Sequence, residues 1–142
     1  MKFVYANLNK MRWINSFVAL IIVMCCCQVK SDQGKLKQEI AAINLTRGEI
    51  TLCGSGEGQF GEVGFEVSCS DKVRADFNLA TALLHSFEYT EAETVFAKVM
   101  DEDPECVMAY WGVAMSNFHP LWAPPTNEEL EKGSKVVALD DP

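Results

Sequence analysis

The second half of the chain carries apolar residues at the spacing of amphipathic helices. One stripe has members three and four positions apart, at Ala92, Val95, Phe96, Val99 and Met100. A similar stripe precedes it, at Phe77, Ala80, Leu83, Leu84 and Phe87. Because an α-helix has 3.6 residues per turn, each stripe lies on one face, and that face must be buried against another element. The pattern predicts two helices that pack on each other across a short link at residues 88–90.

Helix start signals divide this region into four helices. Each signal is a side chain that can accept a hydrogen bond from the backbone of the first helical turn. The four such residues are Ser70, Thr90, Asp103 and Thr126. Pro104 follows Asp103 at a position that suits the first turn of a helix, and Glu93 and Glu129 lie three residues after the two threonines. The two threonine and glutamate pairs have the spacing of a capping box. The predicted helices span residues 71–87, 91–101, 104–117 and 127–139, and the predicted fold class of this region is all-α.

Several of these residues resemble the signature of the tetratricopeptide repeat, a helix pair that recurs at roughly 34 residues. They are Leu79, Ala80, Leu83, Tyr89, Ala92, Phe96 and Pro104. The family needs small side chains where its two helices approach, and Ala80 and Ala92 occupy those positions. The pattern then restarts, and Ala114 lies 34 residues after Ala80. The resemblance implies two antiparallel helix-pair repeats, residues 73–106 and 107–142, the second with about four inserted residues near the prolines of segment 119–125.

More narrowly, residues 83–89, 109–112 and 119–125 are similar to a group of exported bacterial proteins built from such repeats. The resemblance implies a protein–protein interaction scaffold, with no catalytic residues and no cofactor. Stacks of this kind usually need about three repeats and an end cap. Two copies therefore indicate either a truncated member of the family or a chain that completes its stack with a second copy of itself.

The first 27 residues have the layout of a secretory signal. Lys2, Lys10 and Arg12 precede an uncharged apolar run over residues 17–27. This run is shorter than the roughly 20 residues that a membrane-spanning helix needs. It ends in three cysteines, which resembles a bacterial lipoprotein signal with Cys27 as the lipidated residue. We expect export to the bacterial cell envelope or the medium, and three alternatives stay open: a cleaved signal, a lipid anchor, or an uncleaved signal anchor.

Two segments separate the predicted signal from the predicted helices. Residues 28–48 are mostly polar and predict a tether, because so little apolar surface does not offset the entropy lost on ordering a chain. Residues 49–69 alternate apolar and polar side chains on either side of Gly54, Gly56 and Gly58, which predicts a short β-hairpin. These glycines lack the Lys-Ser or Lys-Thr ending of a phosphate-binding loop.

The net charge of the chain limits the classes of partner that it can bind. The formal net charge is −8, and all acidic residues lie after residue 31, so removal of residues 1–27 with their three basic residues changes it to −11. Nucleic-acid binding needs clustered basic residues that neutralise phosphates, and this class of function is disfavoured. Contact with a membrane is expected only through the N-terminal signal or a lipid anchor.

Aromatic residues of the predicted second repeat are candidates for partner binding: Tyr110, Trp111, Phe118 and Trp122. Tryptophan and tyrosine supply much of the binding energy of protein interfaces, and an aromatic rim on a repeat would receive a protein or peptide segment. Acidic residues nearby favour a basic partner. The alternative is that these rings pack in the core and the loops.

Metal chemistry is the second functional hypothesis. His85, His119, Cys69 and Cys106 are residue types that bind zinc, which would make the chain a small metal-binding or redox protein of the envelope. Their separations of 16, 21 and 13 residues contain no close ligand pair. The structural alternatives are a histidine at a helix C-terminus for His85, where its charge suits the helix dipole, and a polar loop residue packed on Trp122 for His119.

The cysteines outside the predicted signal are candidates for a disulfide, because thiols of exported proteins tend to pair. Cys69 and Cys106 are 37 residues apart, close to one repeat, so stacked repeats bring them to the same edge. A bond requires that their α-carbons come within about 7 Å. The alternatives are a pair between Cys53 and Cys69 across the predicted hairpin, and three reduced cysteines that act as small apolar residues.

Overall fold

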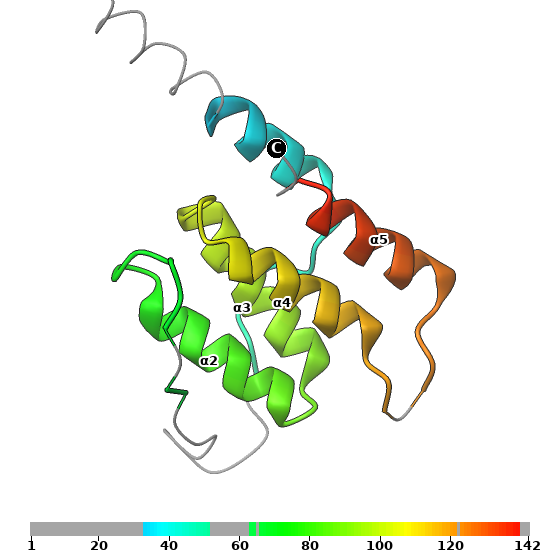
Figure 1. Ribbon diagram of the computed structural model, residues 1–142. Helices are drawn as coiled ribbons and strands as arrows, with labels where there is room; N and C mark the ends of the chain where they lie inside the picture. The colour runs from blue at the N-terminus through cyan, green and yellow to red at the C-terminus, as the bar shows by residue number, and fades with distance from the viewer. Residues whose placement is uncertain (1–32, 52–62, 65, 122, 140–142) are drawn as a thin grey trace, which may run out of the picture. The chain divides into compact units, whose positions relative to one another are not determined.

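The computed structural model describes residues 33–51, 63–64, 66–121 and 123–139. The chain divides into two units, residues 1–35 and 36–142, and the second contains the helices α2 (Arg74–His85), α3 (Tyr89–Glu102), α4 (Val107–Phe118) and α5 (Asn127–Val137) (Figure 1). Residues 33–42 are also helical. The described ranges contain no strand, and the predicted all-α class is confirmed for this part of the chain.

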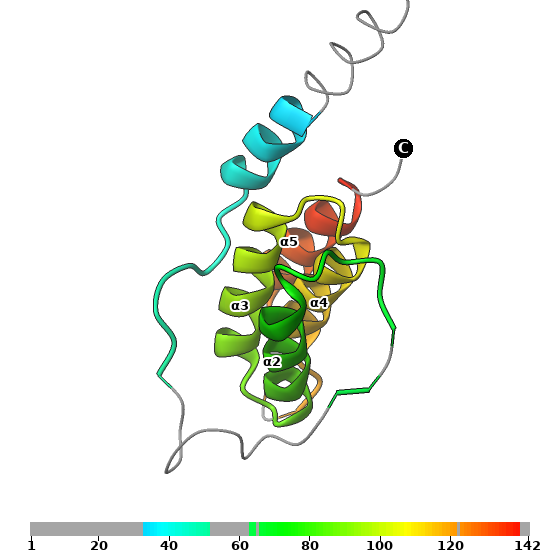
Figure 2. The ribbon, with the colours of Figure 1, turned by 90° about the vertical axis from the view of Figure 1, so that its left-hand side faces the viewer.

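Consecutive helices pack against each other: α2 on α3, α3 on α4 and α4 on α5, with a further contact between α2 and α4. Residues 86–88 join α2 to α3, residues 103–106 join α3 to α4, and residues 119–126 join α4 to α5. These connections are short, so neighbouring helices run in opposite directions (Figure 2). The unit is therefore a succession of two helix pairs, α2 with α3 and α4 with α5.

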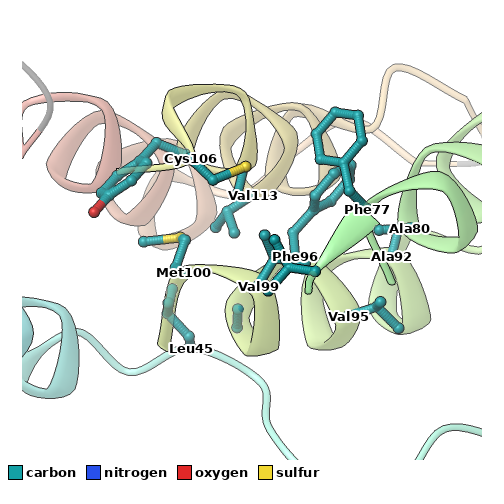
Figure 3. Close-up of a cluster of buried hydrophobic side chains, with 14 of the residues drawn as sticks. Leu45, Phe77, Ala80, Ala92, Val95, Phe96, Val99, Met100, Cys106 and Val113 are labelled. Carbon is teal, nitrogen blue, oxygen red and sulfur yellow. The ribbon is translucent and has the colours of Figure 1, made fainter. Parts of the chain in front are cut away.

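The core is centred on α3, whose apolar stripe is the one expected from the sequence. All five members are buried: Ala92, Val95, Phe96, Val99 and Met100. Figure 3 shows them with Phe77 and Ala80 of α2 and Val113 of α4 in one cluster. The rings of Phe77 and Phe96 meet edge to face with 5.8 Å between centroids, an orientation that aromatic pairs favour.

Gly112 is what allows α4 to lie against the ring of Phe96. A β-carbon at position 112 would stand 2.5 Å from that ring, which is far inside van der Waals contact. Glycine in the middle of a helix costs about 1 kcal/mol relative to alanine. Here the loss is offset by the close packing of α4 on α3.

The residues that carry the repeat resemblance occupy the interior to different degrees. Ala80, Leu83, Ala92 and Phe96 are fully buried, while Leu79, Tyr89, Pro104 and Ala114 are half-buried. The connection 119–126 is five residues longer than the connection 86–88, close to the insertion of four residues that the sequence predicts there.

The helix starts agree with the expected caps only in part. The capping box of Thr126 and Glu129 is present at the start of α5, and this prediction is confirmed. The box predicted for Thr90 and Glu93 is wrong, because α3 already begins at Tyr89 without a side-chain cap. Glu93 is buried and hydrogen-bonded elsewhere.

The two other expected caps are also corrected. Residues 71–73 form a turn, and α2 begins at Arg74 without a side-chain cap from Ser70. Asp103 does not cap α4, which begins at Val107. Its Oδ2 instead accepts a hydrogen bond from the backbone N–H of Ser70 at 2.8 Å, so this carboxylate holds the chain that enters α2.

The described part of segment 28–48 differs from the predicted polar tether. Ile40 and Leu45 are buried in the core cluster, and Arg47 forms an ion pair with Asp101 of α3 at 2.9 Å. The few apolar side chains of this segment are enough to order it, because they pack on the core cluster and Arg47 pairs with an acidic side chain of α3. Residues 43–51 therefore run along α3 as part of the folded unit (Figure 2).

Other expectations fall on residues outside the described ranges. These include the signal segment with Cys27, and Cys53 and Trp122. Of the predicted hairpin, the described residues 49–51, 63–64 and 66–69 contain no strand. Among the described helices none has the length and apolar character needed to cross a membrane.

Candidate functional site

An apolar groove lies between α4 and α5. Its volume is about 730 Å³, and its lining residues are Ala114, Met115, Phe118, Leu130, Gly133, Ser134, Val137 and Ala138. Three of the larger side chains are substantially open to solvent, with exposed fractions of 49% for Phe118, 43% for Leu130 and 48% for Val137. We refer to this surface as the α4–α5 groove.

The base of the groove is made of small residues. A β-carbon at Gly133 would lie 3.3 Å from the Cα of Ala114 and 3.4 Å from its carbonyl oxygen. The two helices therefore approach closely at this point, and the larger side chains stand to either side. Ala114 and Gly133 play in this pair the part that the repeat resemblance assigns to Ala80 and Ala92 in the first pair.

The outward face of α4 extends the apolar surface. Val107 and Trp111 are exposed, and with Ala114 and Phe118 they recur every three or four positions along one side of the helix. No residue of α4 carries a charge. A helix without charged residues is typical of one that is covered on most sides, whereas this side of α4 is open in the described part of the chain.

The predicted aromatic candidates divide into two groups. Trp111 and Phe118 are exposed and belong to the apolar surface of α4. Tyr110 is only 2% exposed, and its hydroxyl donates a hydrogen bond to the carbonyl oxygen of Pro104 at 2.8 Å. Tyr110 is therefore a core residue that braces the start of α4, and the prediction that it binds a partner is corrected.

Sequence reasoning missed the contribution of α5 to the groove. Leu130, Gly133 and Val137 are spaced three and four positions apart, which is the helical spacing of an apolar stripe. This spacing is visible in the sequence, but the charged residues around it give α5 the composition of a polar surface helix.

Glu93 is the buried polar centre of the unit. Its carboxylate accepts hydrogen bonds from the backbone N–H of Thr46 at 2.8 Å, from Asn117 Nδ2 at 3.0 Å and from Lys132 Nζ at 2.9 Å. These donors belong to the segment before α2, to α4 and to α5. Glu93 thus anchors the two helices that form the groove to α3.

A second polar cluster lies where the end of α4 meets the start of α5. Nε2 of His119 lies 3.1 Å from Oε1 of Glu129, and Nδ1 of His119 lies 3.3 Å from the carbonyl oxygen of Ala123. Burial alone would lower the pKa of His119, but the hydrogen bond and the charge of Glu129 outweigh it and raise the pKa above 6.5. Hydrogen bonds from the backbone N–H and hydroxyl of Thr126, and then from His119, lower the pKa of Glu129 to about 2.

The structure contains a disulfide between Cys69 and Cys106, one of the arrangements expected from the sequence, with 4.4 Å between the α-carbons. Both residues are buried. The pairing takes both sulfurs out of the predicted zinc set, and His85 is exposed at the end of α2. In the described ranges no group of three or more histidine, cysteine, aspartate or glutamate side chains is arranged to hold a metal ion.

Over the described residues, the fold and the groove define a helical unit of successive antiparallel helix pairs with an open apolar face. Comparisons with protein families, with curated proteins and with solved structures found no match for this chain.

Proposed function

We propose that this protein is a non-catalytic interaction scaffold of the tetratricopeptide-repeat type, which binds another protein through the α4–α5 groove. The observation that supports this is the groove itself, an open apolar surface between two helices that are fixed to α3. Exposed apolar patches of this kind commonly mark interaction sites on soluble proteins.

The proposed occupant of the groove is an amphipathic helix of a partner protein. The internal arrangement supports this choice, because α4 itself packs against both α2 and α3 and so covers the first helix pair as a partner helix would cover the second. Recognition of a helix by an apolar groove is a recurrent binding mode.

We also propose that the chain works outside the cytoplasm of a bacterium, in the envelope or after secretion. The disulfide between Cys69 and Cys106 supports an oxidising compartment, as does the signal-like sequence at the N-terminus. The bond between Cys69 and Cys106 removes two of the four residues of the alternative zinc site.

Site-specific photocrosslinking tests the binding function. Benzoylphenylalanine at position 118 should give an adduct in cells of the source organism, while the same residue at position 87 should not, because Phe87 is 47% exposed but does not line the groove. The adduct should disappear when Leu130→Asp introduces a charge into the groove. The linked partner segment should be helical and apolar on one side.

Three results would contradict the proposal. They are equal adducts from both positions, an adduct that survives Leu130→Asp, and an adduct formed only with a second copy of this chain. The last would instead indicate self-association through the groove.

A further inference from the structure

His119 connects three elements, the helices α3, α4 and α5. It directly follows α4, its imidazole contacts Glu129 of α5, and its ring lies 5.5 Å from the ring of Tyr89 at the start of α3. Glu129 is fixed in turn by the capping box, in which the backbone N–H and the hydroxyl of Thr126 both contact its carboxylate at 2.7 Å. The imidazole therefore meets a carboxylate that is already held in place.

Both nitrogens of the imidazole face hydrogen-bond acceptors. Nε2 faces the carboxylate of Glu129 and Nδ1 faces the carbonyl oxygen of Ala123. A neutral imidazole has one N–H donor and one lone pair, whereas the imidazolium has two donors. Only the protonated ring can donate to both acceptors, so this geometry selects the charged form of His119.

Among the described residues, few other groups face the ring. The described contacts come from Glu129 of α5, from the phenol of Tyr89 of α3 and from the carbonyl of Ala123 in the connection, while the backbone N–H of His119 donates to the carbonyl of Met115 in α4. Of these, Glu129 is the group that is charged near neutral pH.

The bridge between His119 and Glu129 stands directly beside two groove residues. Phe118 precedes His119 and Leu130 follows Glu129, and both side chains line the groove from opposite helices. The bridge therefore links the backbone next to Phe118 to the backbone next to Leu130.

We propose that the α4–α5 groove is regulated by pH through His119: the protonated ring joins the end of α4 to Glu129 of α5 and holds Phe118 and Leu130 in their binding positions, and loss of the proton releases them. This inference rests on the proposed function, because it concerns the same groove. The raised pKa of His119 agrees with it, and its sign means that the bridged form is favoured at low pH and lost as the pH rises through that pKa.

Nuclear magnetic resonance of the full-length protein between pH 5.5 and 8.5 tests the proposal. The chain has two histidines, so the signal of His119 is identified by its loss in His119→Gln. Its midpoint should lie above 6.5, and the side-chain signals of Phe118 and Leu130 should shift with the same midpoint. In His119→Gln these two side chains should not respond to pH over this range.

Two variants separate the bridge from general effects of pH. Glu129→Gln removes the charge but keeps a side chain that suits the capping box, and it should lower the midpoint of His119 by about 1 pH unit. His85→Gln removes the exposed histidine and should leave the responses of Phe118 and Leu130 unchanged.

The proposal is overturned if the midpoint of His119 lies at or below 6.5, or if Phe118 and Leu130 do not follow it. The measurement needs no partner, so its outcome is independent of the photocrosslinking at position 118. A pH response without an adduct would contradict the proposed function but support the pH-dependent bridge. An adduct without a pH response would support the proposed function and contradict the pH-dependent bridge.

Discussion

At the scale of single residues, Glu93 is the charged residue of the described core, and its buried carboxylate needs compensating contacts. An ionised carboxylate that is 5% exposed is costly unless it is paired and hydrogen-bonded. Here the ammonium group of Lys132 supplies the opposite charge, and Asn117 and the backbone of Thr46 supply further donors. The charge is tolerated because three separate parts of the chain converge on it.

We expect that Glu93→Gln destabilises the protein by about 2 to 4 kcal/mol, because it leaves Lys132 without its counter-charge and places two amide groups against each other. The free energy of unfolding in urea measures this. Glu91→Gln in the first turn of the same helix is the control and should cost less than about 1 kcal/mol. Equal losses for the two variants would show that Glu93 does not act as the anchor described here.

The position of Glu93 also shows where sequence reasoning ends at this scale. Its spacing from Thr90 fits a capping box, and that local pattern is wrong. Its partners Thr46, Asn117 and Lys132 lie 47, 24 and 39 residues away in the sequence. A local sequence pattern does not reveal contacts between residues so far apart along the chain. By contrast, the box of Thr126 and Glu129 involves residues three apart, and the sequence alone is enough to predict it.

At the scale of helices, close approach depends on small residues at the contact points. Ala80 of α2 and Ala92 of α3 are both fully buried, and Figure 3 shows them at the same end of the core cluster. A larger side chain at either position would push the two helices apart.

Ala92→Leu should therefore destabilise the protein by about 1 to 3 kcal/mol through overpacking. Ala75→Leu makes the same chemical change at an exposed position of α2 and should have an effect within about 0.5 kcal/mol. Midpoints of urea denaturation compare the two. The packing described here would be refuted if both variants had the same small effect.

The start of α5 gives a prediction for acid conditions. The pKa of Glu129 is lowered from 4.5 to about 2, so its contribution to stability is complete above pH 4.5 and is lost as the pH falls toward 2. The loss of α5 helicity in acid should therefore be smaller in Glu129→Gln than in the natural chain. Circular dichroism between pH 7 and 2 measures this, and identical acid curves would contradict the assignment.

The number and type of the helices after residue 70 follow from local spacing, so this part of the fold could be predicted from the sequence. The helix over residues 33–42 was not expected. The burial of Ile40 and Leu45 was not expected either, because it depends on the face that α3 offers and not on their own polar surroundings. The groove could be predicted only in part. Phe118 stands out in the sequence as an aromatic residue, whereas Leu130 and Val137 become part of the site only because α5 packs beside α4.

At the scale of the whole molecule, the disulfide between Cys69 and Cys106 joins the chain before α2 to the chain before α4. In the chain-entropy model, a bridge across 37 residues stabilises the folded state by about 3 to 4 kcal/mol. We expect that replacing both cysteines by alanine lowers the free energy of unfolding by this amount. Dithiothreitol should have the same effect on the natural chain and no effect on the double variant.

The same bridge encloses α2 and α3 completely, since both helices lie between the two cysteines. Mechanically, tension along the polypeptide passes from residue 69 through the sulfurs to residue 106 and never loads these two helices. A chain stretched from its ends is then shorter by about 120 Å than one with reduced cysteines. A protease cut in the 86–88 connection would leave the pieces joined, whereas a cut in the 119–126 connection would separate α5 from the rest of the polypeptide.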